Sequence, residues 1–78
     1  MGARTNWLVI SIRLDELPED LRGLLPTFAA VISGGWLVEH RPPNGYIGCN
    51  PLLAEAMDAV RRRHDVTPFD GFYIHIRP

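Results

Sequence analysis

Hydrophobic and polar residues alternate along three segments of the chain, which is the pattern of half-buried β-strands. The clearest segment is 7–14, and segments 36–40 and 72–77 follow the same period of two. Four aliphatic side chains share one face of the first segment: Leu8, Ile10, Ile12 and Leu14. Residues 46–49 predict a short strand that pairs with 36–40, because the Pro-Pro-Asn-Gly sequence between them favours a turn. The pattern therefore predicts four strands.

Two further segments have the three- and four-residue spacing of helices. The first opens near Pro18, which suits a first helical turn, and ends at the glycines of 33–35. Its apolar stripe consists of Leu21, Leu24, Leu25, Phe28, Val31 and Ile32. Pro26 interrupts this stripe, so we expect a kink or two short helices. The second helix has Asn50 as its N-cap and runs to about His64. Its inward residues are predicted to be Leu53, Ala56, Met57 and Val60.

The predicted order of elements is β-α-β-β-α-β, in a single domain of residues 1–78. This order resembles the ferredoxin-like fold, an α+β arrangement of four antiparallel strands with two helices on one face. The resemblance implies that strand 7–14 is central, between the last strand and strand 46–49. The last strand then lies at a sheet edge, where its apolar residues on both faces would favour a homodimer.

Composition narrows the classes of function. Eight arginines, no lysine and nine acidic residues give a net charge of −1, which disfavours a general nucleic-acid-coating protein. The single cysteine fits a reducing cytoplasm. No apolar run approaches the roughly 18 residues of a membrane span, and the N-terminal residues do not resemble a secretory signal. We therefore expect a cytoplasmic protein.

Candidate catalytic and metal-binding residues are few. Cys49 precedes a helix N-terminus, where the helix dipole can stabilise a thiolate, and this keeps a thiol enzyme as a distant alternative. No sequence feature fixes a histidine beside it, so a packing role is favoured. His40, His64 and His75 have no metal-ligand spacing with Cys49 or with each other, and we expect His40 and His75 to be strand-end or surface residues. We predict no enzyme activity, no metal and no cofactor.

Four acidic residues surround the predicted start of the first helix: Asp15, Glu16, Glu19 and Asp20. They either complement the positive end of the helix dipole or form an acidic patch that imitates nucleic-acid phosphates. The dipole interpretation is favoured, and the patch remains a secondary contact surface. Asp58 lies four residues before Arg62, which predicts an ion pair on the second helix.

The sheet face turned away from the helices is the strongest candidate for binding. It is predicted to hold three aromatic residues and three arginines against the single acid Glu39. Aromatic residues and arginine dominate the binding energy of protein interfaces. The predicted binding residues are Trp7, Arg13, Arg41, Tyr46, Tyr73, His75 and Arg77. Such a face could bind another protein, or it could bind a single-stranded nucleic acid by stacking and phosphate contacts.

Two resemblances bear on this choice. Gly45-Tyr46 is similar to the start of the third-strand motif of RNA-recognition motifs, whereas Ile47-Gly48-Cys49 departs from it where further aromatic residues belong. A very short, lysine-free chain without a catalytic motif also resembles the small inhibitors encoded by phages, anti-CRISPR proteins among them. This second resemblance spans the whole chain in general character and includes no shared motif. It implies an inhibitor that covers a functional surface of a larger protein or complex.

Overall fold

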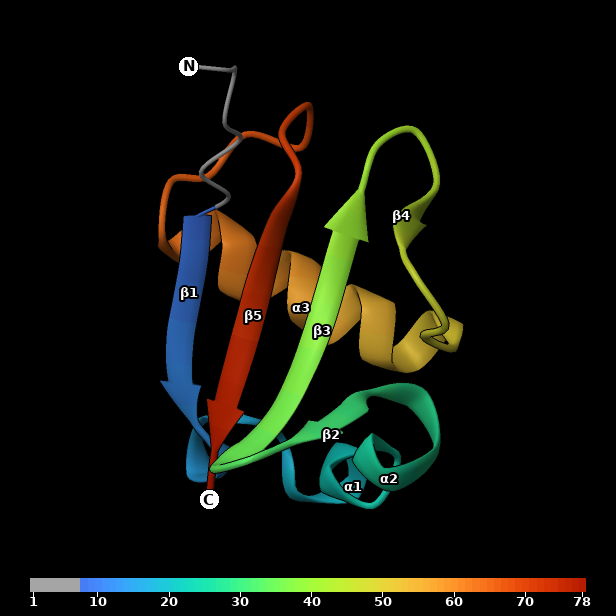
Figure 1. The fold of residues 1–78 in the computed structure, drawn as a ribbon, viewed down its shortest axis with the longest axis vertical. Coiled ribbons are helices and arrows are strands. Elements are labelled where there is room, and N and C mark those ends of the chain that lie inside the picture. Colours follow the sequence, from blue (N-terminus) through green and yellow to red (C-terminus); the bar gives the residue numbers. More distant parts are fainter. Residues whose placement is uncertain (1–7) are drawn as a thin grey trace.

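Residues 8–78 are described by a computed structural model, in which five strands share one sheet (Figure 1). The strands are β1 (Leu8–Arg13), β2 (Ala30–Ile32), β3 (Gly35–Arg41), β4 (Gly45–Tyr46) and β5 (Phe72–Arg77). The helical elements are η1 (Leu14–Glu16, a 3-10 turn), α1 (Glu19–Arg22), α2 (Leu25–Phe28) and α3 (Pro51–Arg63). The predicted α+β class is confirmed. Three of the predicted strands have counterparts in β1, β3 and β5. The strand predicted at 46–49 is confined to β4, because the chain turns at 47–48, and β2 is an additional strand.

The order of the strands differs from the ferredoxin-like prediction. The sheet runs β1-β5-β3-β2, and β4 pairs only with the end of β3. β1 and β5 are parallel, whereas β3 is antiparallel to β5, β2 and β4. The prediction of a fully antiparallel four-stranded sheet with the first strand in the centre is therefore wrong. The placement of the last strand at an edge is also wrong, because β5 has a neighbour on each side.

Burial shows why β5 takes the central position. Its inward side chains Phe72, Ile74 and Ile76 have no exposed surface. On β1 only Ile10 and Ile12 are buried, and Leu8 is 52% exposed. Alternation identifies both segments as strands but does not rank them, because it reports which face is buried and not how many neighbours a strand has.

The segment predicted as a kinked helix forms two short helices, as Pro26 indicated. Pro26 lies in the first turn of α2, where a missing N–H breaks no helical hydrogen bond. Val31 and Ile32 do not continue the apolar stripe of that helix, which corrects the prediction. The chain is already extended at Ala29, and these two β-branched residues pair with β3 in an antiparallel hairpin. Gly34 therefore lies in a hairpin turn and not at a helix end.

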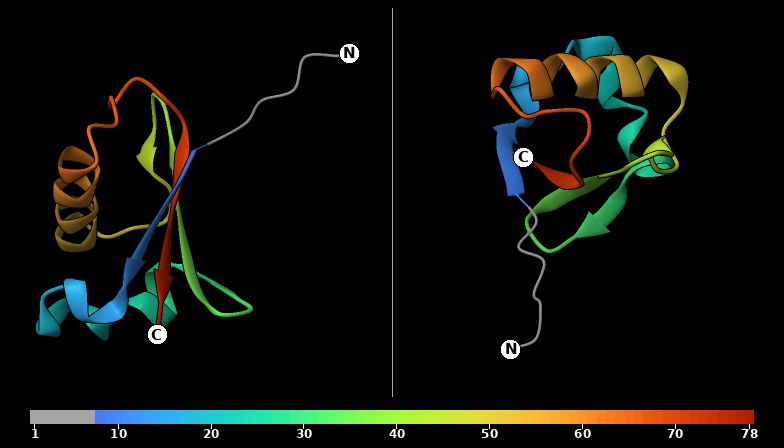
Figure 2. Two further views of the ribbon diagram at one scale, coloured as in Figure 1. Left: turned by 90° about the vertical axis from the view of Figure 1, so that its left-hand side faces the viewer. Right: turned by 90° about the horizontal axis from the view of Figure 1, so that it is seen from above.

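Helix α3 covers one face of the sheet, and α1 lies on the same side (Figure 2). The side-chain oxygen of Asn50 accepts a hydrogen bond from the Leu53 N–H at 2.8 Å, which confirms the predicted N-cap. Three of the predicted inward residues are buried: Leu53, Met57 and Val60. Within residues 8–78 no helix is long and apolar enough to cross a bilayer.

Candidate functional site

One face of the sheet is left without a helix, and we call it the open face. In Figure 1 the sheet lies in front of α3, so the open face is turned towards the reader. Its side chains alternate with the buried residues of β1, β3 and β5. They are Val9, Ser11, Arg13, Leu37, Glu39, Arg41, Tyr73, His75 and Arg77.

Five of the seven predicted binding residues lie on this face: Arg13, Arg41, Tyr73, His75 and Arg77. Trp7 lies outside the described residues. Tyr46 is on the other side of the sheet, because it pairs in register with the buried His40 and its hydroxyl contacts α3. The register across the 41–45 turn sets this orientation, and the turn sequence alone does not reveal it.

Two hydrogen bonds fix polar side chains on the central strand. His75 Nε2 donates to the carbonyl oxygen of Gly34 at 3.1 Å, which ties the imidazole to the β2–β3 turn. Arg77 Nε donates to Ser11 Oγ at 2.9 Å, across the parallel β1–β5 pair. Arg13 and Arg77 are register partners on these strands, so two cationic side chains start from adjacent positions.

Two of the three arginines on the open face are paired with carboxylates. Arg13 Nε lies 3.0 Å from Asp15 Oδ1, and Arg41 Nη2 lies 2.6 Å from Glu39 Oε2. Glu39 and Arg41 are two residues apart on one strand, so the period of two could have predicted their pairing. The face is consequently less positive than a count of its arginines suggests.

The open face is hollowed beside β3. The hollow has a volume of about 250 Å³ and is bordered by Leu37 and Glu39 on one side and by Ile47 on another. The end of α2 and the start of β2 complete it with residues Thr27, Phe28, Ala29 and Ala30. Apolar side chains such as Leu37 and Ile47 share the lining with the polar residues Glu39 and Thr27, so the hollow can receive a partner side chain with both apolar and polar parts.

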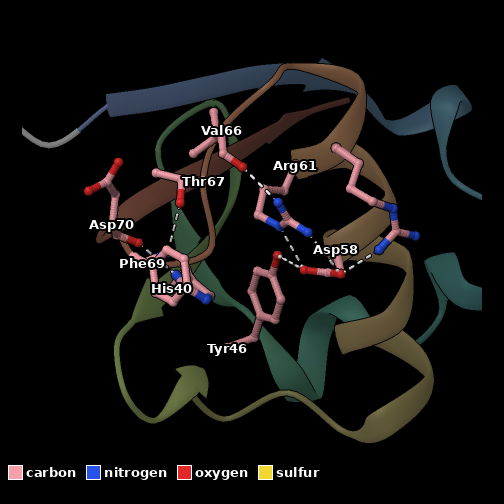
Figure 3. Close-up of polar contacts among 9 residues, drawn as sticks. His40, Tyr46, Asp58, Arg61, Val66, Thr67, Phe69 and Asp70 are labelled. Carbon is pink, nitrogen blue, oxygen red and sulfur yellow. Dashed lines mark hydrogen bonds and ion pairs between the residues drawn. The ribbon is translucent and has the colours of Figure 1, made fainter.

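A polar cluster lies on the covered side of the sheet (Figure 3). The Tyr46 hydroxyl donates to Asp58 Oδ1 at 3.2 Å, and Arg61 Nε donates to the same oxygen at 2.8 Å. Arg61 also donates to the carbonyl oxygen of Val66 at 2.7 Å, and Arg62 forms the predicted ion pair with Asp58. These bonds join β4, α3 and the loop that follows α3.

Electrostatics keep this cluster in one protonation state. The hydrogen bond from Arg61 holds the pKa of Asp58 below its usual value. Burial, and then the nearby charge of Asp58, raise the pKa of Tyr46 far above its usual value. An ionised carboxylate and a neutral phenol therefore persist across ordinary pH, which suits a structural role better than proton transfer.

His40 lies at the end of β3, as predicted, but it is buried, with 6% of its surface exposed, so it is not a surface histidine. Its ring stacks on Phe72 at a centroid distance of 4.5 Å. Its Nδ1 donates to the carbonyl oxygen of Asp70 at 2.9 Å, which satisfies one ring nitrogen inside the protein (Figure 3). Sequence alternation signalled this position, because His40 follows Trp36 and Val38 on the inward face.

Cys49 is half-buried beside α2, and its thiol donates to the carbonyl oxygen of Phe28 at 3.5 Å. Burial raises the pKa of this thiol, so less of it is thiolate than at an exposed cysteine. Among residues 8–78, no group of three or more histidine, cysteine and acidic side chains is arranged to hold a metal ion.

The predicted acidic patch divides into two parts. Asp15 and Glu16 lie in η1 and are bound to Arg13, whose backbone N–H donates to Glu16 Oε2 at 2.8 Å. Glu19 and Asp20 form the first turn of α1 and are exposed. Two of the four carboxylates are therefore paired with Arg13, and Glu19 and Asp20 keep the position at a helix start that the sequence predicted.

The chain was compared with known protein families, with curated proteins and with solved structures, and none of them matches it.

Proposed function

We propose that this protein is a non-enzymatic protein-binding module that inhibits a larger protein or complex, in the manner of an anti-CRISPR-type inhibitor. The observation that carries the proposal is the hollow on the open face. Its volume of about 250 Å³ is below the roughly 300–1,000 Å³ of small-molecule pockets. A hollow of this size suits a single anchoring side chain of a partner, the usual centre of a protein interface.

The exposed edge of β1 extends the proposed contact surface. β1 pairs only with β5, so within residues 8–78 the backbone groups of its other edge have no strand partner. Leu8 and Val9 are both 52% exposed, and the strand contains no proline, glycine or lysine to block pairing. A strand of the partner can extend the sheet here while its side chains contact the open face.

The charge pattern favours a protein partner over a nucleic acid. A nucleic-acid surface needs arginines that are available for phosphates, whereas Arg13 and Arg41 already contact carboxylates. Tyr46 does not lie on the open face and is removed from the set of stacking residues. The juxtaposed Arg13 and Arg77, with Tyr73 and His75 on the same strand as Arg77, remain the support for a single-stranded nucleic-acid partner.

Site-specific photocrosslinking tests the proposal. A photoreactive amino acid replaces Leu37 at the hollow in one variant and His64 at the exposed end of α3 in the control. In lysate of the source organism, we expect Leu37 to crosslink to one defined protein, and His64 not to do so. The same products from both positions, or none from Leu37, would contradict the proposal.

A second measurement separates protein from nucleic acid. Substitution of Arg13 and Tyr73 by alanine removes two outward-facing side chains, and circular dichroism and thermal unfolding first check that the double variant is folded. Binding of the crosslinked protein and of a single-stranded oligonucleotide is then titrated at two salt concentrations. A nucleic-acid partner predicts a steep salt dependence that the double substitution flattens. A protein partner predicts weaker binding at both salt concentrations, with little change in that dependence.

A further inference from the structure

A second and larger hollow lies on the helical side of the molecule, between α1 and α3. It has a volume of about 480 Å³. Five of its lining residues come from one stripe of α3, at positions 52, 55, 56, 59 and 62, and the others come from the segment around α1. We call it the α1–α3 groove, and it shares no lining residue with the hollow on the open face.

The floor of the groove is apolar. Ala56 and Ala59 are small, so α3 leaves space between itself and Leu21 of α1. Leu52 borders the same space and is 61% exposed, although its neighbour Leu53 is completely buried in the core. The fold therefore does not use Leu52 for its core, and its side chain remains available to a partner.

The walls of the groove carry two carboxylates of different origin, Asp20 from α1 and Glu55 from α3. Neither has a hydrogen-bond or ion-pair partner among residues 8–78. Arg62 also borders the groove, and it donates to Asp58 Oδ2 at 2.5 Å, a carboxylate that it shares with Arg61. The groove thus combines an apolar floor with a rim on which two carboxylates outnumber the one arginine.

We propose that the α1–α3 groove binds a segment of a partner protein in which an apolar side chain lies next to a lysine or arginine. The apolar side chain packs over Ala56 and Ala59, against Leu52. The cation lies between Asp20 and Glu55, where charge complementarity selects basic over acidic segments. An amphipathic helix laid along a groove is a known form of such recognition. This surface is independent of the open face, so either proposal can fail without the other.

Chemical-shift mapping on the ¹⁵N-labelled full chain tests the inference. The probe is a capped Lys-Leu-Leu-Lys peptide, with Glu-Leu-Leu-Glu and Lys-Ser-Ser-Lys as peptide controls. We expect the probe to shift backbone amides of α1 and of the Leu52–Arg62 stretch of α3, and each control peptide to bind more weakly. Absent shifts, shifts confined to the open face, or equal binding of either control would overturn the inference.

Variants then locate the contacts. Exposed charge pairs contribute modestly to binding affinity, so D20N combined with E55Q is expected to weaken binding of the probe peptide by about three- to tenfold. A59F fills the floor and should abolish binding. D70N removes one exposed carboxylate that does not line the groove, and it should leave binding unchanged. If the ¹H–¹⁵N spectrum of A59F shows that this variant does not fold, the test rests on the surface variant D20N/E55Q. Unchanged binding of the probe peptide by D20N/E55Q then refutes the inference.

Discussion

Substitution of Gly35 by alanine gives the sharpest test of the strand order. Gly35 begins β3 with a φ of +138°, and a Cβ atom built on it would lie 2.1 Å from the carbonyl oxygen of Ile76 in β5. That carbonyl belongs to the backbone of the central strand and cannot rotate away. The neighbouring Gly34 also has a positive φ, +85°, but a Cβ atom there would meet nothing within 4 Å. Gly34 is therefore a matched control for backbone strain without the clash.

The two substitutions should destabilise the fold by different amounts, because only Gly35→Ala places a methyl group against the backbone of β5. For Gly34→Ala we expect only the left-handed backbone penalty, about 1–2 kcal/mol. For Gly35→Ala the unusual φ costs about 1–3 kcal/mol. Separation of β3 from β5 also breaks at least one ladder hydrogen bond, at about 1 kcal/mol each. The total is about 2–4 kcal/mol, which is a large fraction of the roughly 4–12 kcal/mol typical for a chain of 78 residues.

Urea denaturation followed by far-ultraviolet circular dichroism measures both variants against the parent protein. We expect Gly35→Ala to lower the free energy of unfolding by at least about 1 kcal/mol more than Gly34→Ala, with similar denaturant slopes. An equal or smaller effect of Gly35→Ala would refute the reasoning. In the ferredoxin-like arrangement β3 would not lie beside β5, and no carbonyl of β5 would oppose the added methyl group.

Three further predictions concern the covered side of the sheet. Tyr46→Phe removes the hydroxyl that donates to Asp58, and thermal unfolding should show a loss of about 1 kcal/mol with the fold retained. The lowered pKa of Asp58 adds stability that is complete above its unfolded-state pKa, near pH 4, and is lost as the pH falls through its folded-state value. Asp58→Asn should therefore reduce the loss of unfolding free energy as the pH falls below about 4. The same loss in the variant and the parent protein would contradict the lowered pKa of Asp58. The raised pKa of Cys49 predicts slower alkylation by iodoacetamide at pH 8 than for an exposed cysteine peptide, and Cys49→Ala should leave partner binding within a few fold.

The sequence by itself determined the features that depend on neighbours within a few residues. The alternation at 7–14, 36–40 and 72–77 located strands, since a period of two is a property of one segment. Pro26 predicted a kink or a division into two short helices, of which the structure has the second, and Asn50 predicted the start of α3. The Asp58–Arg62 pair followed from the four-residue spacing of a helix. Most of the open face was predicted for the same reason, because side chains alternate strictly along each strand.

Only the tertiary structure decided which strands are neighbours and which side chains meet across them. β1 and β5 have equivalent patterns, and the central place of β5 reflects burial summed over both of its partners. Tyr46 does not lie on the open face as predicted, because the register of β4 on β3 directs its side chain towards Asp58. The two hollows also arise from residues distant in the sequence, at contacts between β3 and the α2 region and between α1 and α3. Such features depend on the free energy of packing whole faces together, which no local window of sequence contains.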